Sequence, residues 1–273
     1  WPGSLFLIPA AIRSWRMRAE PAVRFCLAWA VPSWIVFELV PTKLPHYPLP
    51  VYPAICLLIA AALFAVREPA YALFRRGWQK AVGGLWALVG GALAAAALVL
   101  PVLYGEGFAW VAIPTALAAA AAAILPLRKS WSGLHLPAAA LAVLLAVPTY
   151  AGVFQGVMPS LDRIWIAPRL ADAVRAVAPA GATVILSGYS EPSAVFLIGT
   201  ATRLTSAEAV AEALAADPDA VGVVDARDLP AFAARAAALG LPPLEPRTEV
   251  AGFNYSKGRA LDLKVFRRDG PSP

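Results

Sequence analysis

The stretch PTKLPHYPLPVYP, residues 41–53, separates two apolar runs and holds five prolines, a lysine, a histidine and two tyrosines. Proline fixes φ and restricts the residue before it, so the stretch predicts a stiff turn. The apolar runs on either side, residues 25–40 and 51–66, each approach the length of a membrane-spanning helix, which is about 20 residues. The turn is therefore expected at a membrane boundary, between two spans.

Composition supports a membrane protein. The 273 residues are 60% hydrophobic and 15% charged, whereas soluble domains average about 45–50% apolar and about 25% charged residues. Further apolar runs at residues 82–104, 108–125 and 134–154 bring the expectation to about five full spans, and residues 1–12 form part of another. The predicted fold of residues 1–156 is an α-helical transmembrane bundle. Cys26 and Cys56 both lie in apolar runs, so no disulfide is predicted.

Basic residues orient the predicted spans. Residues 1–156 hold 11 Lys and Arg, and all except Lys43 lie in three connections that alternate with residues 41–50 and 105–107. The positive-inside rule makes the three basic connections cytoplasmic. The proline-rich turn and everything after the last span are then extracytoplasmic. The basic pI therefore comes from the cytoplasmic connections and indicates topology and contact with the inner leaflet, and no nucleic-acid partner is predicted.

Residues 157–273 read as a separate soluble domain, with 12 Lys and Arg against 13 Asp and Glu. The pattern predicts strands at 183–187 and 220–225, helices at 161–178, 192–198 and 231–239, and a hairpin of strands 249–253 and 260–267. Thr205 and Glu208 have the spacing of a capping box that opens a further helix through residue 216. Strand–helix alternation followed by a hairpin predicts a small α/β sandwich on the outer face.

The proline-rich turn also carries candidate binding residues. Lys43 is a fixed cation, His46 a titratable donor and Tyr47 a hydroxyl, and Glu38 lies near the end of a span, where a carboxylate needs a partner. Together they predict a site for an anionic headgroup, such as a lipid phosphate, at the outer membrane boundary. The alternative is a plain re-entry turn with tyrosine anchors at the interface.

Four stretches carry a resemblance to a known family: TKLPHYPLPVYPA at 42–54, WPGSLFLIPA at 1–10, GYSEPSAVFLIGT at 188–200 and GFNYSKGR at 252–259. The chain resembles bacterial polyprenyl-phosphate-dependent glycosyltransferases of the GT-C fold. These enzymes form the protein mannosyltransferase and lipid A aminoarabinose transferase superfamily, of the glycosyltransferase 39 type. The resemblance spreads over most of the chain and is most specific at the proline-rich turn.

The resemblance implies transfer of a sugar from an undecaprenyl- or other polyprenyl-phosphate carrier to lipid A, protein or polysaccharide, on the outer face of the bacterial inner membrane. Lys43 and Tyr47 match the family's Lys and Tyr and would face the carrier phosphate. Relatives vary at His46, and Glu38 is a candidate from physical reasoning alone. The family's catalytic carboxylate belongs to a loop expected upstream of Trp1, so no catalytic residue and no cofactor is assigned here. A divalent cation is left open for the complete enzyme.

In the outer domain, Tyr189 and Glu191 follow a predicted strand, where α/β folds often bind ligands. They are candidate acceptor-side residues, and the alternative is a plain strand-to-helix turn. Asp225 and Asp228 are candidate metal or sugar ligands, although Asp228 is more simply a helix N-cap. No zinc-type site is predicted, because the two histidines are far apart and no cysteines are paired.

A polytopic transporter or scaffold with an outer binding domain is the alternative to a transferase. A transporter favours charged or broken spans that line a path near the bilayer midplane. The three later predicted spans carry no charge in their interiors. A scaffold leaves the Lys43, His46 and Tyr47 grouping without a role. The sequence therefore favours the transferase.

Overall fold

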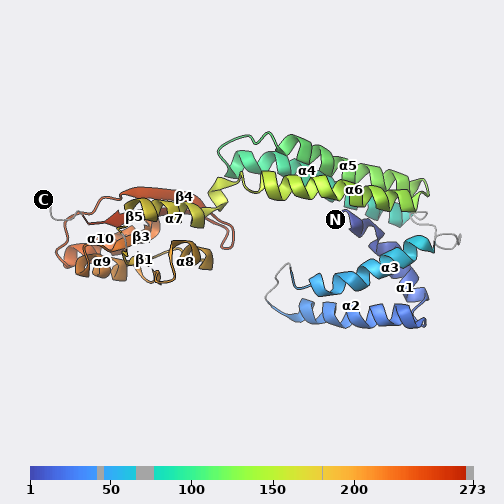
Figure 1. Ribbon diagram of the computed structural model, residues 1–273, viewed down its shortest axis with the longest axis horizontal. Coiled ribbons are helices and arrows are strands. Elements are labelled where there is room, and N and C mark those ends of the chain that lie inside the picture. The colour runs from blue at the N-terminus through green and yellow to red at the C-terminus, as the bar shows by residue number, and fades with distance from the viewer. Residues whose placement is uncertain (42–45, 66–76, 180, 269–273) are drawn as a thin grey trace. The chain divides into compact units, whose positions relative to one another are not determined.

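The computed structural model describes residues 1–41, 46–65, 77–179 and 181–268, and it separates into two compact units (Figure 1). The helical unit comprises Trp1–Pro101 and Phe108–Pro159, and the sheet unit comprises Val102–Gly107 and Ser160–Pro273. Each unit has its own buried cores.

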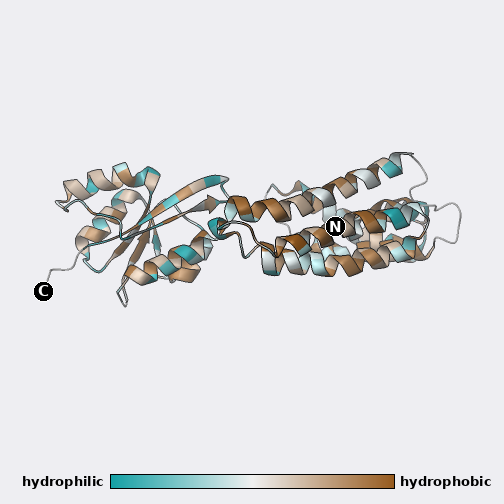
Figure 2. Ribbon diagram, turned by 90° about the horizontal axis from the view of Figure 1, so that it is seen from above, coloured by the Kyte–Doolittle hydropathy of each residue, from teal (hydrophilic) through white to brown (hydrophobic). Residues whose placement is uncertain are grey.

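The helices up to residue 157 are mostly apolar along their length, as Figure 2 shows. They are α1 (Leu7–Arg16), α2 (Pro21–Leu39), α3 (Tyr52–Phe64), α4 (Gly77–Tyr104), α5 (Ala112–Trp131) and α6 (His135–Gly152), with a π-helical turn at Val153–Val157 and short 3₁₀ turns at Gly3–Phe6 and Leu49–Val51. Among the described residues, four helical stretches are long and apolar enough to cross a membrane: Pro21–Leu39, Gly77–Tyr104, Ala112–Trp131 and His135–Val157. The apolar helix Leu49–Phe64 is shorter. The chain is therefore a multi-pass membrane protein, and the expected count of about five full spans stays a prediction.

Small residues bring α4 and α5 close together. The buried cluster between α4 and α5 is built from Ala94 and Ala97 on one side and Ala112, Ala116 and Ala119 on the other. Small side chains let membrane helices approach closely and gain dispersion contacts. A second cluster joins α1, α2 and α3 around Ala10, Cys26, Ala54 and Leu58.

The sheet unit is a three-layer α/β sandwich, which confirms the predicted small α/β domain. Its five strands are β1 (Val184–Leu186), β2 (Arg203–Leu204), β3 (Val221–Asp225), β4 (Thr248–Asn254) and β5 (Arg259–Arg267), in the order β2-β1-β3-β5-β4. Helices α7 (Ile166–Val177) and α8 (Pro192–Ile198) belong to the core on one face of the sheet, and α9 (Ala207–Ala216) and α10 (Leu229–Ala238) to the core on the other. Strand β1 alternates accordingly, since Val184 and Leu186 enter the first core and Ile185 the second.

Strand directions place three connections at one edge of this sheet. Strands β1 and β3 are parallel, β5 is antiparallel to β3, and β4 is antiparallel to β5. The β4–β5 turn therefore lies at the edge where β1 and β3 end. The connection after β1 leads to α8 on one face and the connection after β3 leads to α10 on the other, which is the topological switch point of the sheet.

Several local predictions need correction. The helix predicted at 161–178 is shorter, because α7 begins at Ile166 after a 3₁₀ turn at Asp162–Ile164. Helix α5 begins at Ala112 instead of residue 108 and continues past Pro126 to Trp131. The N-cap of α9 is Ser206, whose Oγ accepts a hydrogen bond from the Ala209 amide at 3.4 Å, so Thr205 is not the capping residue. Strand β2 was not predicted, because its two residues, Arg203 and Leu204, are exposed and carry no apolar pattern.

Candidate functional site

The turn between α2 and α3 is described from His46 onward, and Lys43 lies outside the described residues. The Leu49 amide donates to the His46 carbonyl at 3.1 Å, and the Val51 amide donates to the Pro48 carbonyl at 3.0 Å. Val51 is fully buried in the α1–α3 core. These contacts fix the second half of the turn to the start of α3.

Aromatic rings join the turn to the end of α2. The Tyr47 ring stacks on Phe37 of α2 with centroids 5.9 Å apart, and the His46 ring meets Tyr47 edge-on at 5.2 Å. His46 is exposed and Tyr47 half-buried, and the exposed Glu38 directly follows Phe37 in the chain. The structure thus brings His46 and Tyr47 together and places both beside the last turn of α2. Any contact of Lys43 with them stays a prediction.

A second polar grouping lies at the switch point of the sheet unit. The Glu191 carboxylate accepts hydrogen bonds from the Asn254 amide at 3.3 Å and from the Ser256 hydroxyl. The Lys257 ammonium donates to the Ser190 hydroxyl at 3.4 Å, and the Arg259 guanidinium donates to the Gly188 carbonyl at 3.2 Å. The two stretches of the sheet unit that carry the family resemblance, 188–200 and 252–259, therefore meet in space.

A buried carboxylate lies beside Gly188 in this grouping. The Asp225 carboxylate, at the end of β3, is 1% exposed and pairs with the Arg227 guanidinium. Burial alone would raise the pKa of Asp225, but hydrogen bonds from the Arg227 side chain and amide, with the charges of Arg227 and Arg259, hold it below its ordinary value. Asp228 accepts a bond from the Ser187 hydroxyl at 3.4 Å and makes no side-chain cap for α10.

Tyr189 and Glu191 differ in what surrounds them. Tyr189 is 6% exposed within the core shared with α7 and α8. Burial, together with the charges of Glu191 and Tyr255, raises the pKa of Tyr189, and a hydrogen bond with Ser193 opposes this shift. Glu191 faces the hairpin turn. Their acceptor-side role stays a prediction. Sequence reasoning missed Asn254 and Ser256 as partners of Glu191 and Arg259 as the partner of the Gly188 carbonyl, although the motif that holds all three was visible.

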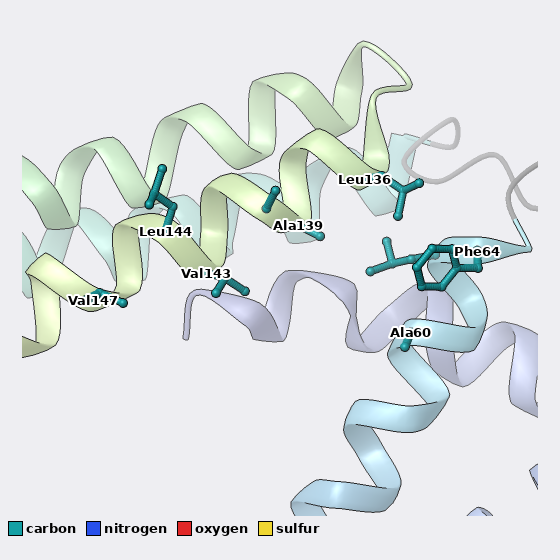
Figure 3. A pocket seen from close by; sticks show the side chains of 9 residues that line it. Ala60, Phe64, Leu136, Ala139, Val143, Leu144 and Val147 are labelled. Carbon is teal, nitrogen blue, oxygen red and sulfur yellow. The ribbon is translucent and has the colours of Figure 1, made fainter.

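Among the residues that the structure describes, no three His, Cys, Asp or Glu side chains group as metal ligands. The helical unit holds an apolar groove of about 710 Å³ between α3 and α6 (Figure 3). Its walls are Ala60, Leu63 and Phe64 from α3 and Leu136, Ala139, Ala140, Val143, Leu144 and Val147 from α6.

No protein-family model and no curated protein sequence matches the chain. Two solved structures do, both of ArnT from Cupriavidus metallidurans. The apo structure is 15% identical with a TM-score of 0.53, over 95% of this chain and 50% of that one. The structure bound to undecaprenyl phosphate is 16% identical with a TM-score of 0.56, over 97% of this chain and 51% of that one. The chain therefore has a GT-C-type fold and spans about half the length of the ArnT chains it matches.

Proposed function

We propose that the chain is part of a polyprenyl-phosphate-dependent glycosyltransferase of the GT-C type. The observation that carries this proposal is the likeness, over 97% of the chain, to a protein crystallised with undecaprenyl phosphate. The proline-rich turn supports it, because an exposed imidazole and a ring-anchored phenol lie together at the end of an apolar helix.

In this proposal Lys43, His46 and Tyr47 bind the carrier phosphate at the outer membrane boundary, and Glu38 orients a donor among them. A lipid-phosphate leaving group gains negative charge as the glycosidic bond breaks. A fixed cation and hydroxyl donors at that oxygen therefore stabilise the transition state more than the ground state. No residue of this chain is assigned as the catalytic carboxylate in this proposal.

The acceptor is proposed to be lipid A, a protein or a polysaccharide, approaching from the periplasmic side. Tyr189 and Glu191 are its candidate contacts, and the switch-point position of their loop supports this assignment. The transporter and scaffold alternatives gain no support from a specific contact among the described residues.

The test is a Lys43→Ala variant of the whole enzyme in membranes. Loss of a cation that stabilises developing charge costs on the order of a hundredfold in turnover. We expect a loss of that size in transfer of sugar from a polyprenyl-phosphate donor, with unchanged expression. Lys80→Ala removes a lysine from a predicted cytoplasmic connection and is the matched control, which should keep full turnover. Equal activity of the two variants would remove the role assigned to Lys43.

A further inference from the structure

The α3–α6 groove has a polar side chain, His135, at one end. A second cavity of about 710 Å³ is lined by residues 133–137 together with Leu63 and Phe64. Leu63, Phe64 and Leu136 line both cavities, so the two adjoin each other. Together they form one groove with an apolar length along α6 and a polar end at the first residue of that helix.

The polar end is His135. Its side chain is 5% exposed, and its Nδ1 atom has no hydrogen-bond partner among the described residues. It stands at the N-terminus of α6, where unpaired amides and the helix dipole favour an anion. A buried imidazole nitrogen without a partner costs stability unless a ligand or water satisfies it. This end of the groove is therefore suited to an acidic headgroup.

Basic residues lie directly beside that end. The Leu134 amide donates to the Lys129 carbonyl at 2.9 Å, and the Gly133 amide to the Ser130 carbonyl at 3.0 Å. This turn holds the last turn of α5, with the exposed Arg128 and Lys129, against the start of α6. Trp131 is exposed in the same turn, as expected at the headgroup level of a membrane.

The length of the groove selects its occupant. The lining residues Leu136 to Val147 span about 16 Å of α6, at about 1.5 Å per residue. One leaflet of a bilayer has a hydrocarbon depth of about 15 Å, half of about 30 Å. The groove thus fits an acyl chain from the leaflet at the basic end. The phosphate of the proposed sugar carrier is assigned to residues 43–47, and Phe64 ends α3 at the helix terminus farther from them.

We propose that the groove binds one anionic phospholipid from the leaflet at this basic end. The acidic headgroup lies against His135, Arg128 and Lys129, and one acyl chain follows α6 toward Val147. This site is separate from the carrier site and does not depend on the proposed transferase activity. On the positive-inside orientation, the leaflet is the cytoplasmic one.

The test is native mass spectrometry of the whole protein released from bilayers of equal phosphatidylglycerol and phosphatidylcholine. The protein should retain one phosphatidylglycerol in preference to phosphatidylcholine. Near a membrane surface each basic side chain is worth about fivefold in affinity for anionic lipid, so Arg128→Gln with Lys129→Gln should lower the preference by about 25-fold. Arg24→Gln with Lys80→Gln removes the same charge from residues outside the α5–α6 turn and should leave the preference unchanged.

A second pair of variants tests the groove itself. Ala140 is exposed along the groove and Ala92 is exposed on α4. Ala140→Phe should abolish retention, and Ala92→Phe should preserve it. The proposal is overturned if the two phenylalanine variants retain lipid equally, if the two double-glutamine variants show the same preference, or if the retained molecule is a polyprenyl phosphate.

Discussion

Gly188 supports the switch-point loop in two ways: it adopts a backbone conformation that favours glycine, and its missing side chain leaves room for Asp225 and Asp228. Its φ is +84°, and a Cβ there would overlap the Cβ of Asp225 and lie 3.1 Å from the Asp228 carboxylate. Gly181 has nearly the same φ, +80°, with nothing within 4 Å of an added Cβ. The two glycines therefore share a conformational demand and differ in a steric one.

This difference separates two energies. Placing an L-residue in the left-handed region costs roughly 1–2 kcal/mol, and this cost destabilises both Gly181→Ala and Gly188→Ala. Forcing a methyl group into packed structure costs about 1–3 kcal/mol more, and only Gly188→Ala meets this cost. The expected destabilisation is therefore about 1–2 kcal/mol for Gly181→Ala and about 2–5 kcal/mol for Gly188→Ala.

Pulse proteolysis in urea on the detergent-solubilised chain measures both, with the sheet unit followed as a fragment. At about 1–3 kcal/mol per molar urea, the midpoint of Gly188→Ala should fall on the order of 1 M below that of Gly181→Ala. Equal midpoints would refute the argument, because they would mean that Asp225 moves aside at no cost.

Three further outcomes follow from the sheet unit. Ser206→Ala should destabilise it by about 1 kcal/mol and Thr205→Ala by much less in the same assay, since only Ser206 caps α9. Asp225→Asn should cost about 1–2 kcal/mol of stability at neutral pH. Because the folded state depresses the pKa of Asp225, its carboxylate stabilises the fold above the unfolded pKa, about 3.9, and this stability is lost as the pH falls through the folded pKa. The cost of the substitution should therefore shrink in acid, and a pH-independent cost would contradict this argument. Asn254→Ala should speed hydrogen exchange at the amides of Ser256 and Lys257, which donate to the Asn254 side chain, and unchanged exchange would exclude that anchoring role.

Local patterns predicted the sheet unit well. The helix at 192–198 has the bounds expected from its preceding Glu-Pro, and the hairpin strands extend those expected by one residue at most ends because alternation marks a half-buried strand clearly. The capping residue was misplaced by one position, because Thr205 and Ser206 are both good caps and only the backbone direction decides between them. Helix α5 continues beyond its predicted end at residue 125, because Pro126 does not end a helix whose neighbours pack around it.

The meeting of Glu191 with Asn254 and Ser256 was beyond local patterns. These residues are more than 60 positions apart, and strand order alone decides that their loops share one edge. A two-residue strand such as β2 also forms only because β1 offers it a partner. At the proline-rich turn, the residue types indicated an anion site, but the stacking of Tyr47 on Phe37 depends on how α2 and α3 pack.

Helices α5 and α6 have a consequence for how this protein tolerates change. The hydroxyls of Thr115 and Thr149 donate to the carbonyls four residues earlier, those of Val111 and Leu145, each at 2.7 Å. The alanine-lined contact between α4 and α5 therefore discriminates by side-chain volume, and the Thr115 hydroxyl adds no polar selectivity to it. A substitution that adds a methylene at the buried Ala119 destabilises the packing, whereas the exposed Leu117 faces outward and accepts most apolar residues. The buried alanine positions of this bundle are thus constrained in side-chain volume, whereas its exposed positions are constrained only to be apolar.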